Sequence, residues 1–101
     1  MIKKEEVYNM NYKTEYAKNN NLEFENYNGW CNMDTWLVMV WLENDQNNYE
    51  GITRIINNTN KLKDLSDLEL YMILKDFNYG NDKVDFTKVD LDEIRLGLIE
   101  E

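Results

Sequence analysis

The sequence predicts an all-α fold, a small bundle of about four helices, and three observations support this prediction. A strongly apolar segment follows a helix-start signal at Asn32. Isoleucines recur at helical spacing between residues 46 and 60, and a capping box begins at Ser66. At 101 residues and 12.2 kDa, the chain is long enough for one domain. We expect residues 1–28 to be a less ordered N-terminal segment and residues 29–101 to be the helical domain.

The N-terminal segment, residues 1–28, mixes Lys, Glu, Tyr and Asn without a clean period, so it is expected to be partly helical or extended. The asparagines at 19–21 stop any helix there, because Asn competes for its own backbone hydrogen bonds and favours turns. Residues 22–24 are compatible with a short extended piece. Asn28-Gly29 is a strong turn signal.

The first helix is predicted from Asn32, its N-cap, to about Asn44, with Asp34 in the first turn near the positive end of the helix dipole. Its apolar residues extend nearly all round, which predicts a central position in the bundle. The main stripe is expected at Met33, Trp36, Leu37, Val40 and Trp41, widened by Val38, Met39 and Leu42.

A second helix is expected after Asp45-Gln46-Asn47, with Tyr49, Ile52, Ile55 and Ile56 on one face. It ends in the polar run at 57–60.

The third helix has the clearest start signal, since Ser66 and Glu69 form a capping box that Leu65 and Leu70 flank as a hydrophobic staple. It is expected to run to Phe77 and to close in a turn at residues 78–82, with Gly80 as the left-handed residue. A last helix follows Asp90 and presents the apolar side chains of Leu91, Ile94, Leu98 and Ile99.

Residues 28–36 read Asn-Gly-Trp-Cys-Asn-Met-Asp-Thr-Trp. This segment resembles the N-G-W-T-N-x-E-T-W segment of small uncharacterised proteins from bacteriophages and other mobile elements. Cys31 replaces the usual Thr and Asp34 the usual Glu. The matching positions are Gly29, Trp30, Asn32, Thr35, Trp36 and Trp41. In those proteins the segment is often followed by an aromatic helix and Asn-Asp, as in residues 37–45 here, so the resemblance covers about a fifth of the chain. It implies a phage or mobile-element setting and brings no enzyme motif with it.

The formal charge of -9 makes direct binding to nucleic acid or to an anionic membrane unfavourable, because both attract positive surfaces. A basic protein is the expected partner, and the oligomeric state stays open. No apolar stretch approaches the roughly 20 residues that span a bilayer, and no secretory signal follows Met1. With Cys31 as the one cysteine, no intrachain disulfide can form. We therefore expect a cytoplasmic protein of a bacterial host cell.

The sequence favours no catalytic, cofactor or metal site. The chain has no histidine, so Cys31 lacks the partner that activates a catalytic thiol. Residues 80–86 look like the end of an EF-hand loop, but Lys88 stands where a bidentate Glu is needed. Metal-assisted hydrolysis by paired carboxylates stays open, although acidic residues at helix starts are already explained by the helix dipole.

The acidity is concentrated in one half of the chain. Residues 1–63 hold nine acids and seven bases, a net of -2, whereas residues 64–101 hold eleven acids and four bases, a net of -7. A solvated face is the ordinary explanation. The alternative is a negative partner-binding surface. Its expected residues are Asp64, Asp67, Glu69, Asp76, Asp82, Asp85, Asp90, Asp92 and Glu93.

The tryptophans divide into two groups. Trp36 and Trp41 are expected in the core, whereas Trp30 follows a glycine and either covers the core or projects as an anchor at an interface.

The leading hypothesis is therefore a phage-encoded acidic inhibitor of a host defence nuclease, most plausibly an anti-CRISPR protein. It would bind the effector and block nucleic-acid binding, without catalysis. Charge reversal at Asp90, Asp92 and Glu93 is then expected to abolish inhibition and leave the fold intact. The alternative is a non-enzymatic phage accessory or assembly protein that binds another phage protein.

Overall fold

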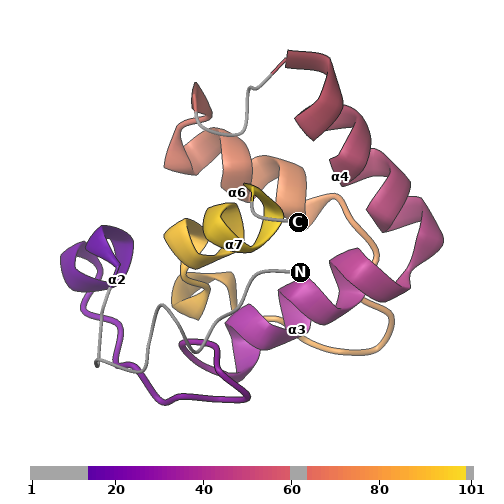
Figure 1. The fold of residues 1–101 in the computed structure, drawn as a ribbon. Coiled ribbons are helices and arrows are strands. Elements are labelled where there is room, and N and C mark those ends of the chain that lie inside the picture. The colour runs from indigo at the N-terminus through magenta and orange to yellow at the C-terminus, as the bar shows by residue number, and fades with distance from the viewer. Residues whose placement is uncertain (1–13, 60–63, 100–101) are drawn as a thin grey trace.

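The computed structural model describes residues 14–59 and 64–99, and it confirms the predicted all-α fold. Within these ranges α7 lies in the middle of the molecule and contacts α2, α3 and α6, while α4 packs against α3 (Figure 1). The elements are α2 (Glu15–Asn19), α3 (Met33–Asn44), α4 (Gln46–Thr59), α6 (Asp67–Lys75), the 3-10 turn η1 (Phe86–Lys88) and α7 (Leu91–Ile99). None of the helices within these ranges has the length and apolar character needed to cross a membrane.

The start of α3 is as predicted, but its most buried face is not. The Asn32 side chain accepts a hydrogen bond from the Thr35 N–H at 2.9 Å and so caps the helix. The stripe that begins at Met33 was expected to face the core, yet Met33 is 47% exposed and the rest of that stripe is half-buried. The buried side chains of α3 are Asp34, Thr35, Val38, Met39 and Leu42. Because α3 is apolar nearly all round, its pattern does not select the inner face; its contacts with α7 and α4 do.

The turn that leads into α3 is closed by a pair of hydrogen bonds. The Tyr27 N–H donates to the Trp30 carbonyl at 2.7 Å, and the Trp30 N–H donates to the Tyr27 carbonyl at 2.8 Å. Asn28 (φ 51°) and Gly29 (φ 88°) both adopt the left-handed region, which Asn and Gly tolerate best. The predicted Asn28-Gly29 turn is therefore confirmed.

The described part of the N-terminal segment packs on the helical domain. α2 ends at Asn19, where the asparagine run predicts it, and Asn21 has a positive φ of 56°. Ala17, Leu22 and Cys31 form a small apolar cluster beside the main core. Residues 1–13, which include the rest of the predicted N-terminal segment, lie outside the described residues.

The predicted signals at Ser66 and Gly80 are confirmed, whereas α4 begins at Gln46, before its predicted start, and Tyr49 of its predicted apolar face is 46% exposed. Both hydrogen bonds of the capping box between Ser66 and Glu69 are present. α6 ends at Lys75, two residues before the predicted Phe77. Gly80 has a φ of 58°, and a Cβ at this position would lie 2.6 Å from the Trp41 ring, so this turn requires glycine. The fully buried core joins the helices through Val38, Met39, Leu42, Ile52, Leu70, Leu74, Val89, Leu91 and Ile94.

Candidate functional site

The nine carboxylates of the predicted acidic surface do not form one exposed surface. Asp90 and Glu93 are 0% exposed and lie in the interior. The prediction that they belong to an exposed partner-binding surface is therefore wrong. Asp92 is half-buried. The other carboxylates are exposed, namely Asp64, Asp67, Glu69, Asp76, Asp82 and Asp85.

Asp90 is buried because it joins three segments of the chain. Its carboxylate accepts a hydrogen bond from the Thr14 hydroxyl at 2.8 Å, and it caps α7 by accepting the Glu93 N–H at 3.2 Å. Its own backbone N–H donates to the hydroxyl of Thr35, in the first turn of α3, at 3.0 Å. The start of α7 is thus tied to residues that precede α2 and begin α3.

Further hydrogen bonds join residues 31–34, which span the start of α3, to η1, α7 and the residue before η1. The backbone N–H of Cys31 donates to a Glu93 carboxylate oxygen at 2.8 Å. The Asn32 side chain, besides capping α3, donates to the Lys88 carbonyl at 2.7 Å, and Asp34 accepts the backbone N–H of Asp85 at 2.9 Å. We call the bonded set Thr14, Cys31, Asn32, Asp34, Thr35, Asp90 and Glu93 the helix-start interlock. Its members are all buried, so its polar atoms serve the fold.

Trp30 belongs to the core and does not project as an interface anchor. It is 4% exposed, and its ring lies against Gly97 of α7, where an added Cβ would be 3.0 Å from the ring. Of the two alternatives for Trp30, the structure therefore supports the one in which it covers the core. Trp36 and Trp41, expected in the core, are half-buried, and the Trp41 indole N–H donates to Asp82 at 2.9 Å.

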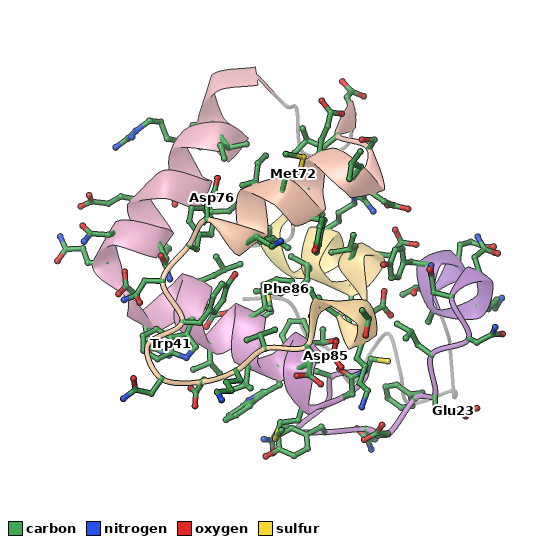
Figure 2. All side chains as sticks on the ribbon, turned by 180° about the vertical axis from the view of Figure 1, so that it is seen from behind. Glu23, Trp41, Met72, Asp76, Asp85 and Phe86 are labelled. Carbon is green, nitrogen blue, oxygen red and sulfur yellow. The ribbon has the colours of Figure 1, made fainter. Side chains whose placement is uncertain are left out.

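Several of the exposed carboxylates also hold local structure. Arg95 bridges Asp67 and Asp92, with N···O distances of 2.8 Å to each. Asp85 accepts both the hydroxyl and the backbone N–H of Thr87, and these two bonds lower the pKa of Asp85. Figure 2 shows Asp76 at the end of α6 and Asp85 beside η1, at separate places on the molecule. The exposed acids are therefore distributed over separate places on the molecule.

A feature that the sequence reasoning missed lies on the outer side of α6. Leu68 is 65% exposed and Met72 is 59% exposed, although both are large apolar residues of this helix. Leu70 and Leu74 are 0% exposed. The two pairs are offset by two residues, or about 200° round a helix of 3.6 residues per turn, so they face opposite sides. That offset is the sequence signal that could have revealed the exposed pair.

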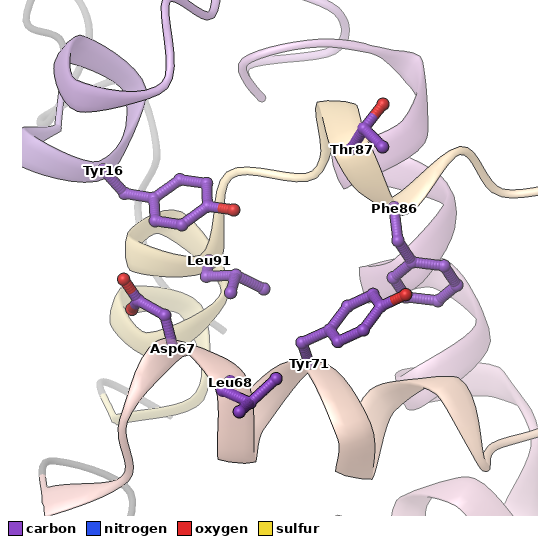
Figure 3. A pocket seen from close by; sticks show the side chains of 7 residues that line it. All are labelled: Tyr16, Asp67, Leu68, Tyr71, Phe86, Thr87 and Leu91. Carbon is purple, nitrogen blue, oxygen red and sulfur yellow. The ribbon is translucent and has the colours of Figure 1, made fainter.

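Beside this exposed pair is an open groove of about 270 Å³, formed by α2, α6, η1 and α7. Tyr16, Leu68, Tyr71 and Phe86 form its walls, Leu91 lies between them, and Asp67 stands at its edge (Figure 3). Burial, and after it the nearby Asp67 carboxylate, raise the pKa of Tyr16. The groove is therefore apolar and aromatic with an acidic edge.

The described residues show no constellation with an evident catalytic geometry. Cys31 is buried, and its sulfur donates to the Glu23 carbonyl at 3.4 Å. In ranges 14–59 and 64–99, no group of three or more His, Cys, Asp and Glu side chains is placed to hold a metal ion. The arrangement is suited to binding a surface, through exposed carboxylates and an apolar groove.

Comparison with known proteins places the chain in one family. The model of DUF7249, a family of unknown function, matches residues 23–100, so the chain belongs to this family. No curated protein and no solved structure matches the chain.

Proposed function

We propose that this DUF7249 protein is a non-enzymatic, cytoplasmic binding protein of a phage or other mobile element that inhibits a host defence nuclease. In its most specific form, the partner is a CRISPR effector whose nucleic-acid-binding surface the protein occupies. The setting follows from the resemblance of residues 28–36 to mobile-element proteins. The mode of action follows from the exposed acids.

The observation that carries this proposal is the acidity that stays at the surface after the buried acids are set aside. Residues 64–85 hold six exposed carboxylates and two lysines, a net of -4. A nuclease holds nucleic acid with Lys and Arg, which also attract a negative protein surface. The exposed carboxylates would compete with phosphates for those side chains, and salt would weaken the complex.

The test is capture of partners by the tagged protein from a bacterial lysate that contains CRISPR and restriction systems, at low and high salt. The captured protein is identified by mass spectrometry, and its nucleic-acid binding is then measured with and without the inhibitor. We expect a basic nucleic-acid-binding effector that is released at high salt and that the inhibitor prevents from binding its target.

The charge mechanism is tested with a matched pair of variants. Asp64→Lys combined with Asp76→Lys changes two exposed acids beside α6, and Glu25→Lys combined with Glu50→Lys makes the same charge change at exposed positions elsewhere. We expect the first variant to lose inhibition and the second to retain it. Equal inhibition by both variants would contradict a specific acidic surface. Recovery of only the protein itself or of another phage protein would favour the accessory or assembly function instead.

A further inference from the structure

The outer side of α6 has the two most exposed large apolar side chains among the described residues. Leu68 and Met72 are four residues apart, so they lie one above the other on the same face. Figure 2 shows Met72 at the outer surface of α6. Single exposed apolar residues need no explanation, but here the pair borders the groove described above. Leu68 and Tyr71 belong to that groove and also to a second hollow beside Met72, so the apolar surface is continuous along α6.

The size and openness of the groove decide what it can hold. Sites for small molecules enclose about 300–1,000 Å³ and bury most of the ligand. This groove has about 270 Å³ and is open to solvent, with Tyr16 directed towards Leu91 and the Tyr71 ring packed edge-on against Phe86 (Figure 3). It has room for one or two apolar side chains that a protein segment carries into it, and its open side would leave a free ligand exposed to solvent.

The negative charge around this apolar surface favours a positively charged occupant. Residues 64–76 carry four exposed carboxylates, at 64, 67, 69 and 76, against Lys75, a net of -3. Arg95 is 15% exposed and pairs with Asp67 and Asp92, so these three side chains together contribute a net charge of -1. The Lys75 ammonium lies 5.1 Å from the centre of the Tyr71 ring, so this ring already accepts a cation on its face.

We propose that the groove between α2, α6, η1 and α7 binds a basic amphipathic helix of the partner protein. One or two aliphatic side chains of that helix enter the groove against Leu68 and Tyr71, and its Lys and Arg side chains meet the carboxylates of residues 64–76. This is the helix-in-groove mode of recognition, with charge complementarity at the rim. The inference rests on the proposed function, in which the partner is basic, and it names the surface of contact.

The probe is a labelled synthetic peptide of about 18 residues, long enough to form a helix, with Leu at i, i+3, i+4 and i+7 positions and Lys elsewhere. A control peptide has the same composition with its Leu residues spread evenly round the helix. Binding to the full chain is measured by fluorescence anisotropy. The test variant, Leu68→Gln with Met72→Gln, keeps helix propensity and charge, and the control variant is Met33→Gln, at a residue that is 47% exposed outside the groove.

We expect the amphipathic peptide to bind the wild-type chain and Met33→Gln equally, and to bind the Leu68→Gln/Met72→Gln variant at least about tenfold more weakly. Both changed residues are largely exposed, so circular dichroism should show an unchanged fold. The inference would be overturned if the wild-type chain bound both peptides with equal affinity, or if the double variant bound the amphipathic peptide as tightly as the wild type does. In either case the peptide would be attracted by charge alone. A dimer in sedimentation that the double variant abolishes would also overturn it, by assigning this face to a second copy of the chain.

The two proposals fail in different ways. If the double variant still captures and inhibits a basic nuclease as the wild type does, the groove is not the contact surface and the proposed function stands. If no basic nucleic-acid-binding protein is captured while the groove still binds the amphipathic peptide selectively, the defence-nuclease function is wrong and the peptide site remains.

Discussion

Replacing Thr35 by valine tests the helix-start interlock with almost no change of shape. The Thr35 hydroxyl accepts the Asp90 N–H at 3.0 Å and donates to the Asn32 side-chain oxygen at 2.8 Å, and the residue is 0% exposed. Valine removes the acceptor of the buried Asp90 N–H, which costs about 1–3 kcal/mol. Loss of the hydroxyl's hydrogen bond to Asn32 adds about 0.5–1.5 kcal/mol to this cost. The Asn32 side-chain oxygen still accepts the Thr35 backbone N–H at 2.9 Å. We expect Thr35→Val to lower the free energy of unfolding by about 2–4 kcal/mol.

The assay is urea unfolding followed by tryptophan fluorescence and circular dichroism, with a thermal scan. For a domain of this size, each kcal/mol corresponds to about 4–8 °C in Tm, so a fall of about 10 °C or more is expected. The control is Thr87→Val, whose hydroxyl donates to Asp85 at 2.6 Å but is exposed, so water can replace the bond. This change should stay within about 0.5 kcal/mol. If Thr35→Val cost no more than Thr87→Val, the interlock would not hold the helix starts together.

Two other predictions concern the linker between α6 and η1. Gly80→Ala places a Cβ 2.6 Å from the Trp41 ring at a φ of 58°, so we expect a loss of about 2 kcal/mol or more in unfolding free energy. Burial raises the pKa of Tyr79, whose hydroxyl donates to the Leu74 carbonyl at 2.7 Å. The neutral hydroxyl therefore contributes stability that is complete below the unfolded pKa of about 10 and is lost as pH rises through the higher folded pKa. Tyr79→Phe should reduce this alkaline loss of stability, measured by urea unfolding between neutral and high pH.

Each of these changes has a matched control. Gly51 lies inside α4, and Gly51→Ala adds a methyl group 3.1 Å from the Phe77 ring. Alanine also has a helix propensity about 1 kcal/mol more favourable than glycine, so we expect little net change in the free energy of unfolding. If Gly80→Ala were equally harmless, the close approach of Trp41 would not constrain the turn. Tyr49→Phe, at a residue that is 46% exposed, removes the same hydroxyl group from the surface and is the matched control. The same alkaline dependence in Tyr79→Phe and wild type would contradict the role of Tyr79.

The fold was largely predictable because its helices carry local signals. Asn32, the Ser66–Glu69 capping box and the Asn28-Gly29 turn act through neighbours within a few residues, so their structures follow from the sequence alone. The face of α3 was not predictable in this way. Its inner side is set by contacts with residues far along the chain, such as the bond between Thr35 and Asp90.

The acidic surface shows the same division between local and distant causes. A carboxylate at a helix start is expected to be exposed, and this holds for Asp67 and Glu69 of α6. It fails for Asp90 and Glu93, because the partners that compensate their burial come from residues 14 and 31. We therefore expect charge reversal at Asp90, Asp92 and Glu93 to disrupt the fold, because Asp90 and Glu93 are buried and hydrogen-bonded.

The helix-start interlock also gives residues 28–36 a structural role, and this role limits what the segment indicates about function. Gly29 forms the turn, Trp30 fills the core beside Gly97, and Asn32 and Thr35 join α3 to the chain around η1 and α7. All of these residues fall within the family match over 23–100. In this chain these residues set the way in which the helices meet. Residues that decide the partner are better sought on the outer face of α6, where Leu68 is exposed and has no such role in the core.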